Sequence, residues 1–178
     1  MEESIIFSGF GGQGILFAGK LIAYSGMTED KEVSWIPSYG PEMRGGTANC
    51  SVKISDMPVS SPVVSEPDYL VAMNTPSYSK FIGNVRPGGK VFLDSSMIDL
   101  KCERDDIECF YVPASQLAHE KGTDGMANII LCGKLVKETQ IIMTESVRTA
   151  LRKIIPEKAK YLVELNLEAF SAGFDYRD

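Results

Sequence analysis

Short apolar runs along the chain alternate with stretches in which apolar residues recur every three or four positions. A continuous apolar run that stops at glycine or proline is typical of a strand buried in a parallel sheet. Alternation, as for Cys50, Val52 and Ile54, is typical of a strand with one buried face. These runs predict strands at residues 4–8, 32–36, 48–55, 69–73, 90–94 and 107–112, with Pro37 ending the second.

The stretches between the strands predict helices, because their apolar residues fall on one helical face. Thr75, Asp124 and Thr144 are expected as helix caps, and Pro156 is expected to open the last helix. The predicted helices cover residues 14–26, 75–85, 113–121, 124–135, 144–154 and 156–173. Strands alternating with helices predict an α/β protein with a mostly parallel sheet and helices on its faces. The length of 178 residues suits a single domain, residues 1–178.

The charge of the chain argues against two classes of partner. Its net charge is −6, which disfavours a broad nucleic-acid surface or an anionic membrane as a partner. No apolar run approaches the roughly 20 residues that span a bilayer. The first four residues, Met-Glu-Glu-Ser, are acidic where a signal peptide is basic. We therefore expect a cytoplasmic protein with no nucleic-acid or membrane partner.

The cysteines do not predict a metal site. They form no CxxC pair, and the single histidine, His119, is not placed to complete a zinc set. Runs typical of ferredoxin-type clusters are also missing, so an iron–sulfur cluster would have to lie on another subunit. We expect reduced thiols, with Cys50 an inert group rather than a nucleophile and His119 at the surface. The four cysteines are Cys50, Cys102, Cys109 and Cys132.

A glycine motif follows the first predicted strand and precedes the first predicted helix. Gly9, Gly11 and Gly14 fit the GxGxxG pattern, and a helix N-terminus beside such a turn attracts phosphate or carboxylate. The dinucleotide fingerprint also needs an acid at the end of the second strand, where residues 35–37 are Trp, Ile and Pro. The motif therefore indicates a turn that binds an anion or a partner, rather than an NAD site. The structural alternative is a tight turn with no ligand.

A second glycine-rich segment, residues 38–50, carries a carboxylate and a guanidinium. Arg44 suits a carboxylate or phosphate ligand, and Glu42 could either pair with Arg44 as an internal brace or act on the ligand. Thr47 and Asn49 follow on the strand face opposite Cys50. Elsewhere, Asp94 ends a predicted strand, where it could bind a ligand or cap a turn or helix. These residues do not make a complete catalytic set.

Together the motifs resemble the gamma subunit of 2-oxoacid:ferredoxin oxidoreductases, and the resemblance covers nearly the whole chain, thinning after about residue 137. It rests on GFGGQG (9–14), PSYGPEMRGGTANCSVKIS (37–55), SSPVVSEPDYLVAMN (60–74) and PGGKVFLDSS (87–96). It implies a three-layer α/β/α domain with a Rossmann-like sheet and a helical C-terminal end. It also implies an enzyme complex that oxidatively decarboxylates a 2-oxoacid, making acyl-CoA and reduced ferredoxin. Thiamine diphosphate, Mg and iron–sulfur clusters would sit on partner subunits, alpha and beta or alpha, beta and delta.

The resemblance implies a role in assembly and in coenzyme A access. The implied coenzyme A-binding candidates are Gly9, Gly11, Gly12, Gln13, Gly14, Tyr39, Glu42, Arg44, Gly45, Gly46, Thr47 and Asn49. The SYGPEMRGGTAN form is closest to the 2-oxoglutarate branch and is sometimes shared with branched-chain 2-oxoacid enzymes. A branched-chain or pyruvate enzyme, a stand-alone nucleotide-binding domain and a non-catalytic assembly module are the alternatives. We expect a homodimer when the chain is isolated.

Overall fold

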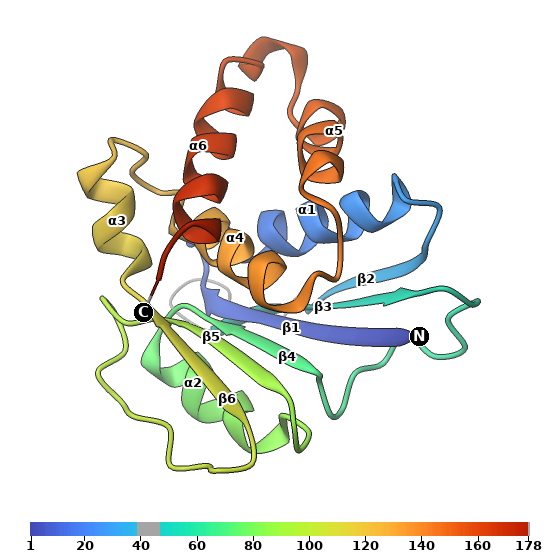
Figure 1. Ribbon diagram of the computed structural model, residues 1–178, viewed down its shortest axis with the longest axis vertical. Coiled ribbons are helices and arrows are strands. Elements are labelled where there is room, and N and C mark those ends of the chain that lie inside the picture. Colours follow the sequence, from blue (N-terminus) through green and yellow to red (C-terminus); the bar gives the residue numbers. More distant parts are fainter. Residues whose placement is uncertain (39–46, 178) are drawn as a thin grey trace.

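A computed structural model describes residues 1–38 and 47–177, and in this part of the chain it shows one six-stranded sheet with helices on both faces (Figure 1). The strands are β1 (Glu2–Phe10), β2 (Glu32–Ser38), β3 (Thr47–Ser55), β4 (Tyr69–Ala72), β5 (Lys90–Asp94) and β6 (Glu108–Val112). The α-helices are α1 (Ile15–Met27), α2 (Thr75–Phe81), α3 (Ala114–Glu120), α4 (Ala127–Thr139), α5 (Thr144–Ile154) and α6 (Leu162–Phe174). Two 3₁₀ turns, η1 (Ile82–Asn84) and η2 (Glu157–Ala159), complete the regular elements.

The sheet has the order β2-β3-β1-β4-β5-β6, and only β3 of these strands runs against the others. The pairs β1–β4, β4–β5 and β5–β6 are parallel, whereas β3 is antiparallel to both β1 and β2. The predicted mostly parallel sheet is therefore confirmed. One edge of the sheet consequently holds the C-terminal ends of five strands and the start of β3.

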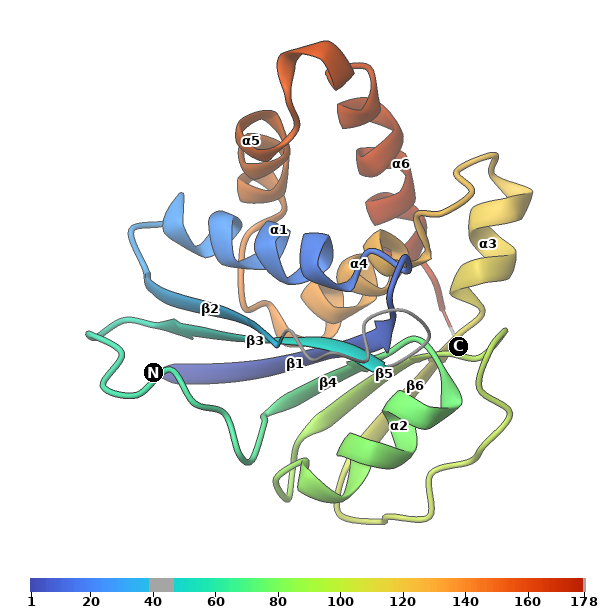
Figure 2. The same cartoon turned by 180° about the vertical axis from the view of Figure 1, so that it is seen from behind.

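Helices cover the two faces of the sheet unequally, as Figures 1 and 2 show. The larger core lies between the sheet and α1, α4, α5 and α6, and a smaller core lies under α2 on the opposite face. Within the larger core, α4 and α6 approach backbone to backbone at two glycines. A Cβ at Gly133 or at Gly173 would clash with main-chain atoms of the facing helix. The three-layer arrangement and the helical C-terminal end are as predicted.

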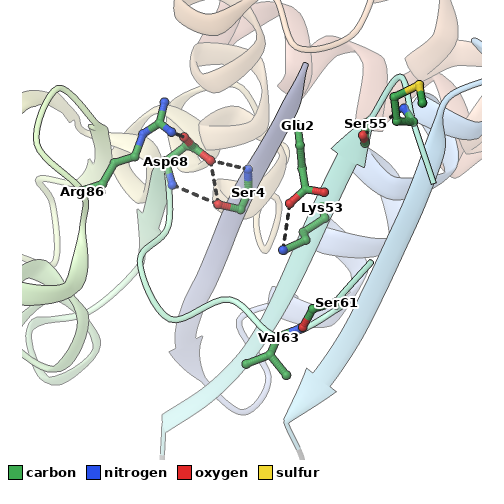
Figure 3. Close-up of polar contacts among 9 residues, drawn as sticks. Glu2, Ser4, Lys53, Ser55, Ser61, Val63, Asp68 and Arg86 are labelled. Carbon is green, nitrogen blue, oxygen red and sulfur yellow. Dashed lines mark hydrogen bonds and ion pairs between the residues drawn. The ribbon is translucent and has the colours of Figure 1, made fainter. Parts of the chain in front are cut away.

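Polar contacts fix the end of the sheet opposite the glycine motif (Figure 3). The buried Asp68 carboxylate accepts hydrogen bonds from the Ser4 backbone N–H and hydroxyl, both at 2.7 Å, and lies 2.6 Å from Arg86. The Asp68 N–H donates back to the Ser4 hydroxyl at 3.2 Å. At the same end, Lys53 of β3 pairs with Glu2 of β1 at 2.9 Å. The Asp68 contacts join β1 to the chain entering β4, which aligns the parallel pair, and the Lys53 pair joins β1 to β3.

Several predicted boundaries differ from the structure. Pro37 lies inside β2, opposite Cys50 of β3, rather than ending the strand. Because β2 is an edge strand of the described sheet, one side of its backbone has no strand to bond, and proline is tolerated there. Pro156 precedes η2, and α6 begins six residues later at Leu162.

The three predicted helix caps are wrong. Asn74, not Thr75, caps α2, because its side-chain oxygen accepts the Ser77 N–H at 2.9 Å. Asp124 lies too far upstream of α4 and pairs with a neighbouring histidine instead. Thr144 is already inside α5. The residues at the cap positions of α4 and α5 are methionines, whose side chains make no capping bond.

Candidate functional site

The glycine turn, residues 9–14, lies at the sheet edge where five strands end, between β1 and α1. Gly11 and Gly12 are exposed. Gly12 and Gly14 have φ angles of +97° and +72°, a backbone conformation that favours glycine. A Cβ at Gly9 would lie 2.7 Å from the Gln13 side-chain oxygen. The glycines are thus required both by backbone conformation and by close packing.

Gln13 holds this turn in place. Its Oε1 accepts hydrogen bonds from the Phe10 N–H at 2.6 Å and from the Asn74 side-chain amide at 3.1 Å. Its Nε2 donates to the Met73 carbonyl at 3.2 Å. Both ends of the amide are therefore engaged inside the protein. Because Met73 and Asn74 follow β4, these bonds fasten the glycine turn to the β4–α2 connection.

Asn128, at the start of α4, supports the other end of the turn. Its Nδ2 donates to the Gly14 carbonyl at 2.9 Å, and a Cβ on Gly14 would clash with the same amide. Asn128 is 4% exposed, and its Oδ1 is buried without a hydrogen-bond partner. This hydrogen bond holds Gly14, the residue directly before α1. The start of α1 is therefore positioned by a residue of α4.

The N-terminus of α1 lies at this edge beside the exposed Gly11 and Gly12. The first N–H groups of a helix have no partner within it and carry partial positive charge. No acidic residue occupies the first turn of α1, a helix of 13 residues. A phosphate or carboxylate approaching Gly11 and Gly12 would therefore meet a favourable field. This arrangement can bind an anion.

The second glycine-rich segment begins and ends at the same edge. Ser38, the last residue of β2, pairs with Asn49, which in turn pairs with Ser8 of β1. The Thr47 backbone pairs with Phe10. Thr47 and Asn49 thus lie on the strand beside the glycine turn. The predicted site residues Tyr39, Glu42, Arg44, Gly45 and Gly46 lie outside the described residues.

Asp94 was predicted either to bind a ligand or to cap a turn or helix, and its hydrogen bonds are those of a cap. It is fully buried, and its carboxylate accepts bonds from the Ser96 N–H at 3.0 Å and from the Ser115 N–H and hydroxyl, the latter at 2.5 Å. Ser115 lies in the first turn of α3. The carboxylate therefore joins the end of β5 to the start of α3. His119 is at the surface, as expected, with its Nδ1 3.0 Å from Asp124.

The buried cysteines are poor nucleophiles. Burial raises the pKa of the Cys50 thiol to about 12, against a smaller opposing effect from hydrogen bonding with Trp35. Burial likewise raises the pKa of Cys132. Because the thiolate is the reactive form, neither group is activated at neutral pH. All four cysteines are free thiols.

Two observations bear on metals and membranes. Among residues 1–38 and 47–177, no group of three or more His, Cys, Asp or Glu side chains could hold a metal ion. In the same ranges, no helix is long and apolar enough to cross a membrane.

Two residues that organise the site were missed by sequence reasoning. Asn74 and Asn128 lie 60 or more positions from the glycine turn. Asn74 ends the segment 60–74 that supports the family resemblance, but neither residue was among the candidate site residues. Their bonds reach Gln13 and Gly14 across 61 and 114 positions. Asn74 directly precedes Thr75-Pro76, so its capping role could have been found from the preference for asparagine at caps. No local signal identifies the role of Asn128.

Comparison with known proteins gives consistent matches. A family model described as pyruvate ferredoxin/flavodoxin oxidoreductase matches residues 4–176. The ketoisovalerate oxidoreductase subunit VorA of Methanothermobacter marburgensis is 39% identical over 98% of this chain and 36% of its own length. The 2-oxoglutarate synthase subunit KorC of Methanocaldococcus jannaschii is 35% identical over 98% of this chain and 94% of its own length.

A solved structure agrees with these matches. The keto/oxoacid ferredoxin oxidoreductase gamma subunit of Geobacter sulfurreducens superposes with a TM-score of 0.83 at 29% identity, covering 97% of this chain and 96% of that one. The relatives differ in length, since the chain spans about a third of the VorA proteins that it matches.

Proposed function

The chain belongs to the pyruvate ferredoxin/flavodoxin oxidoreductase family as a gamma-type domain, and from this membership we propose that it serves a complex that oxidatively decarboxylates a 2-oxoacid. The products would be acyl-CoA and reduced ferredoxin. Thiamine diphosphate, Mg and iron–sulfur clusters belong to partner alpha and beta subunits, with or without a delta subunit. A cytoplasmic location is part of the proposal.

Within that complex, we assign this chain to the coenzyme A side of the reaction. The observation that carries the assignment is the position of the α1 N-terminus beside the exposed Gly11 and Gly12, in a turn held by Gln13 and Asn128. Coenzyme A carries phosphate groups, which suit free helix N–H groups, and Arg44 would add a guanidinium. The chain's own contribution is to bind and orient, because its described residues at this edge include no activated nucleophile.

The proposed substrate is 2-oxoglutarate, and a branched-chain 2-oxoacid is the second candidate. The 39% identical relative is a ketoisovalerate oxidoreductase subunit, and the 35% identical one is a 2-oxoglutarate synthase subunit. These identities are too close to separate the two acids. A tagged chain, purified anaerobically from its native cells, should bring down larger subunits and support coenzyme A-dependent dye reduction.

The 2-oxoacid that drives this reduction fastest identifies the substrate. If ketoisovalerate exceeds 2-oxoglutarate, the family assignment stands and the substrate assignment fails. If the chain is recovered alone and inactive under conditions that preserve such complexes, the proposal of a working subunit fails.

The coenzyme A role is tested by adding charge at an exposed glycine. Gly11→Asp places a carboxylate beside the N-terminus of α1, and Gly11→Asn adds a side chain of nearly equal shape without charge. A like-charge repulsion of about 1.4 kcal/mol corresponds to a tenfold effect. We expect the coenzyme A KM to rise about tenfold in Gly11→Asp and to change little in Gly11→Asn. Equal effects in both variants would indicate steric disturbance and would remove this argument for an anion site.

The pure assembly role makes a different prediction. If Arg44→Ala weakens subunit association and leaves the coenzyme A KM unchanged, the segment serves assembly. If the KM rises in the intact complex, Arg44 serves the ligand. Arg152, an exposed residue of α5, provides the control through Arg152→Ala.

The same edge offers apolar contact area for a partner. Phe10 and Met97 are 36% and 48% exposed, and Met97 lies beside Thr75, whose hydroxyl donates to its carbonyl at 3.4 Å. Exposed apolar groups of this kind promote association. We therefore propose a homodimer for the isolated chain. A monomer throughout the micromolar range in sedimentation would contradict this.

A further inference from the structure

Two of the four cysteines lie together on the face of the sheet that α2 covers. Cys109 is on β6, and its side chain belongs to the smaller core with Tyr78 and Tyr111. Cys102 is on the connection between β5 and β6, residues 95–107. The Cys102 N–H donates to the Tyr111 hydroxyl at 2.8 Å. This bond holds the connection against β6, two residues from Cys109 and on the same face.

Cys102 and Cys109 are neighbours around Tyr111. After burial, the Cys102 thiol is the next cause that raises the pKa of Cys109 and that of Tyr78. The Cys102 thiol also lies 3.7 Å from the Arg104 carbonyl. Both cysteines are partly exposed, whereas Cys50 and Cys132 are fully buried. A small oxidant can therefore reach this pair and not the other two.

We propose that Cys102 and Cys109 form a reversible intramolecular disulfide that fastens the 95–107 connection to β6. The oxidant is a small-molecule disulfide such as oxidised glutathione. One thiolate attacks the oxidant and releases one glutathione thiol, and the second thiolate then attacks the mixed disulfide and releases another. One S–S bond forms and one breaks, and two protons and two electrons pass from the protein to the two glutathione molecules.

The surroundings of the two cysteines determine how readily the reduced Cys109 thiol loses its proton. Burial, and then the neighbouring Cys102 thiol, raise the pKa of Cys109 to about 12. Cys109 therefore stays protonated at neutral pH, and the thiolate step is slow. We expect oxidation over hours rather than seconds. The bond would close a short loop that Arg104 already joins to the Ile82 and Val85 carbonyls, at 2.9 and 2.7 Å.

The test is made on the full chain, which is digested with trypsin after oxidation. Trypsin places the two cysteines on different peptides, so a disulfide between them is detected as two joined peptides. Cleavage after Lys101 and Arg104 places Cys102 on a short peptide that does not include Cys109. After incubation with oxidised glutathione, acid quenching and alkylation, mass spectrometry should find these two peptides joined. Dithiothreitol should separate them, and Cys102→Ser or Cys109→Ser should abolish the link. Cys50 and Cys132 should remain unlinked and serve as internal controls.

Two outcomes would overturn the proposal. One is persistent glutathione on Cys102 with no 102–109 link, and the other is a link between chains. As a second measurement, the oxidised wild-type chain should unfold at a higher urea concentration than its reduced form, and oxidant should not raise the midpoint of Cys109→Ser. An unchanged wild-type midpoint despite a quantitative link would contradict the restraint of the connection.

Discussion

Replacing Gly14 by alanine tests whether the glycine turn is held by Asn128. The alanine would have to adopt the φ of +72° that Gly14 has, and this conformation costs an L-residue about 1–2 kcal/mol. Its Cβ also clashes with the Asn128 amide, so the hydrogen bond to the Gly14 carbonyl is lost at a further cost of about 1 kcal/mol. We expect Gly14→Ala to lower the free energy of unfolding by about 2–3 kcal/mol, as the sum of these two costs.

Gly12→Ala is the matched control. Its φ is +97°, and nothing lies within 4 Å of an added Cβ, so this variant carries the backbone cost without the clash. Both variants gain the same small benefit from a less flexible unfolded chain, and that benefit cancels in the comparison. The assay is urea unfolding followed by circular dichroism, with the free energies compared at equal slope.

The double variant Gly14→Ala, Asn128→Ala isolates the clash. With the amide removed, alanine at position 14 should cost about 1 kcal/mol less than it does beside Asn128, because only the backbone cost remains. Independent sites add within about 0.3–0.5 kcal/mol. If the two single costs add within that limit, Asn128 does not support the turn.

Other parts of the fold give predictions of the same kind. Asp68→Ala orphans a buried N–H, so it should lower the free energy of unfolding by about 1–3 kcal/mol, whereas Asp56→Ala at an exposed pair should have no measurable effect in the same urea assay. Asp94→Ala should lower the free energy of unfolding by about 0.5–2 kcal/mol. Asp94→Asn should lower it by less, because asparagine keeps an acceptor oxygen. A large rise in the coenzyme A KM with no change in stability would instead favour a ligand role for Asp94. Burial raises the pKa of Cys50 to about 12 and also raises the pKa of Cys132. The two protonated thiols therefore contribute fully to stability below pH 9, and this contribution is lost as the pH rises toward 12. Urea midpoints should therefore stay level below about pH 9 and fall above it, and a flat profile from about pH 9 toward 12 would contradict the burial of these thiols.

The elements of the fold could be predicted because each carries its own local signal. The apolar run of residues 90–94 matches β5 without error, and α1 begins one residue after the predicted start. The reversed direction of β3 has no such signal, because a strand's pattern does not reveal the direction of its neighbours. Pro37 was misjudged for the same reason. Its tolerance depends on β2 being at an edge, which is a property of the assembled sheet.

The candidate site divides in the same way. The glycine motif and the helix that follows it could be read from spacing, since both are local. The bonds that hold the motif could not, because Gln13 meets Asn74 across 61 positions and Asn128 meets Gly14 across 114. Nothing in the residues adjacent to Gln13 shows whether its amide faces a ligand or the protein. Whether Gln13 also contacts a ligand stays a prediction.

The polar contacts at this edge show which of its described side chains are already engaged within the protein. Three polar side chains at this edge bond inward: Gln13 to the β4–α2 connection, Asn128 to Gly14 and Asp94 to the start of α3. Backbone is exposed at Gly11 and Gly12, beside the N-terminus of α1. Backbone N–H groups bind anions but do not transfer protons at neutral pH. The described part of this edge therefore suits the proposed role of positioning a charged ligand.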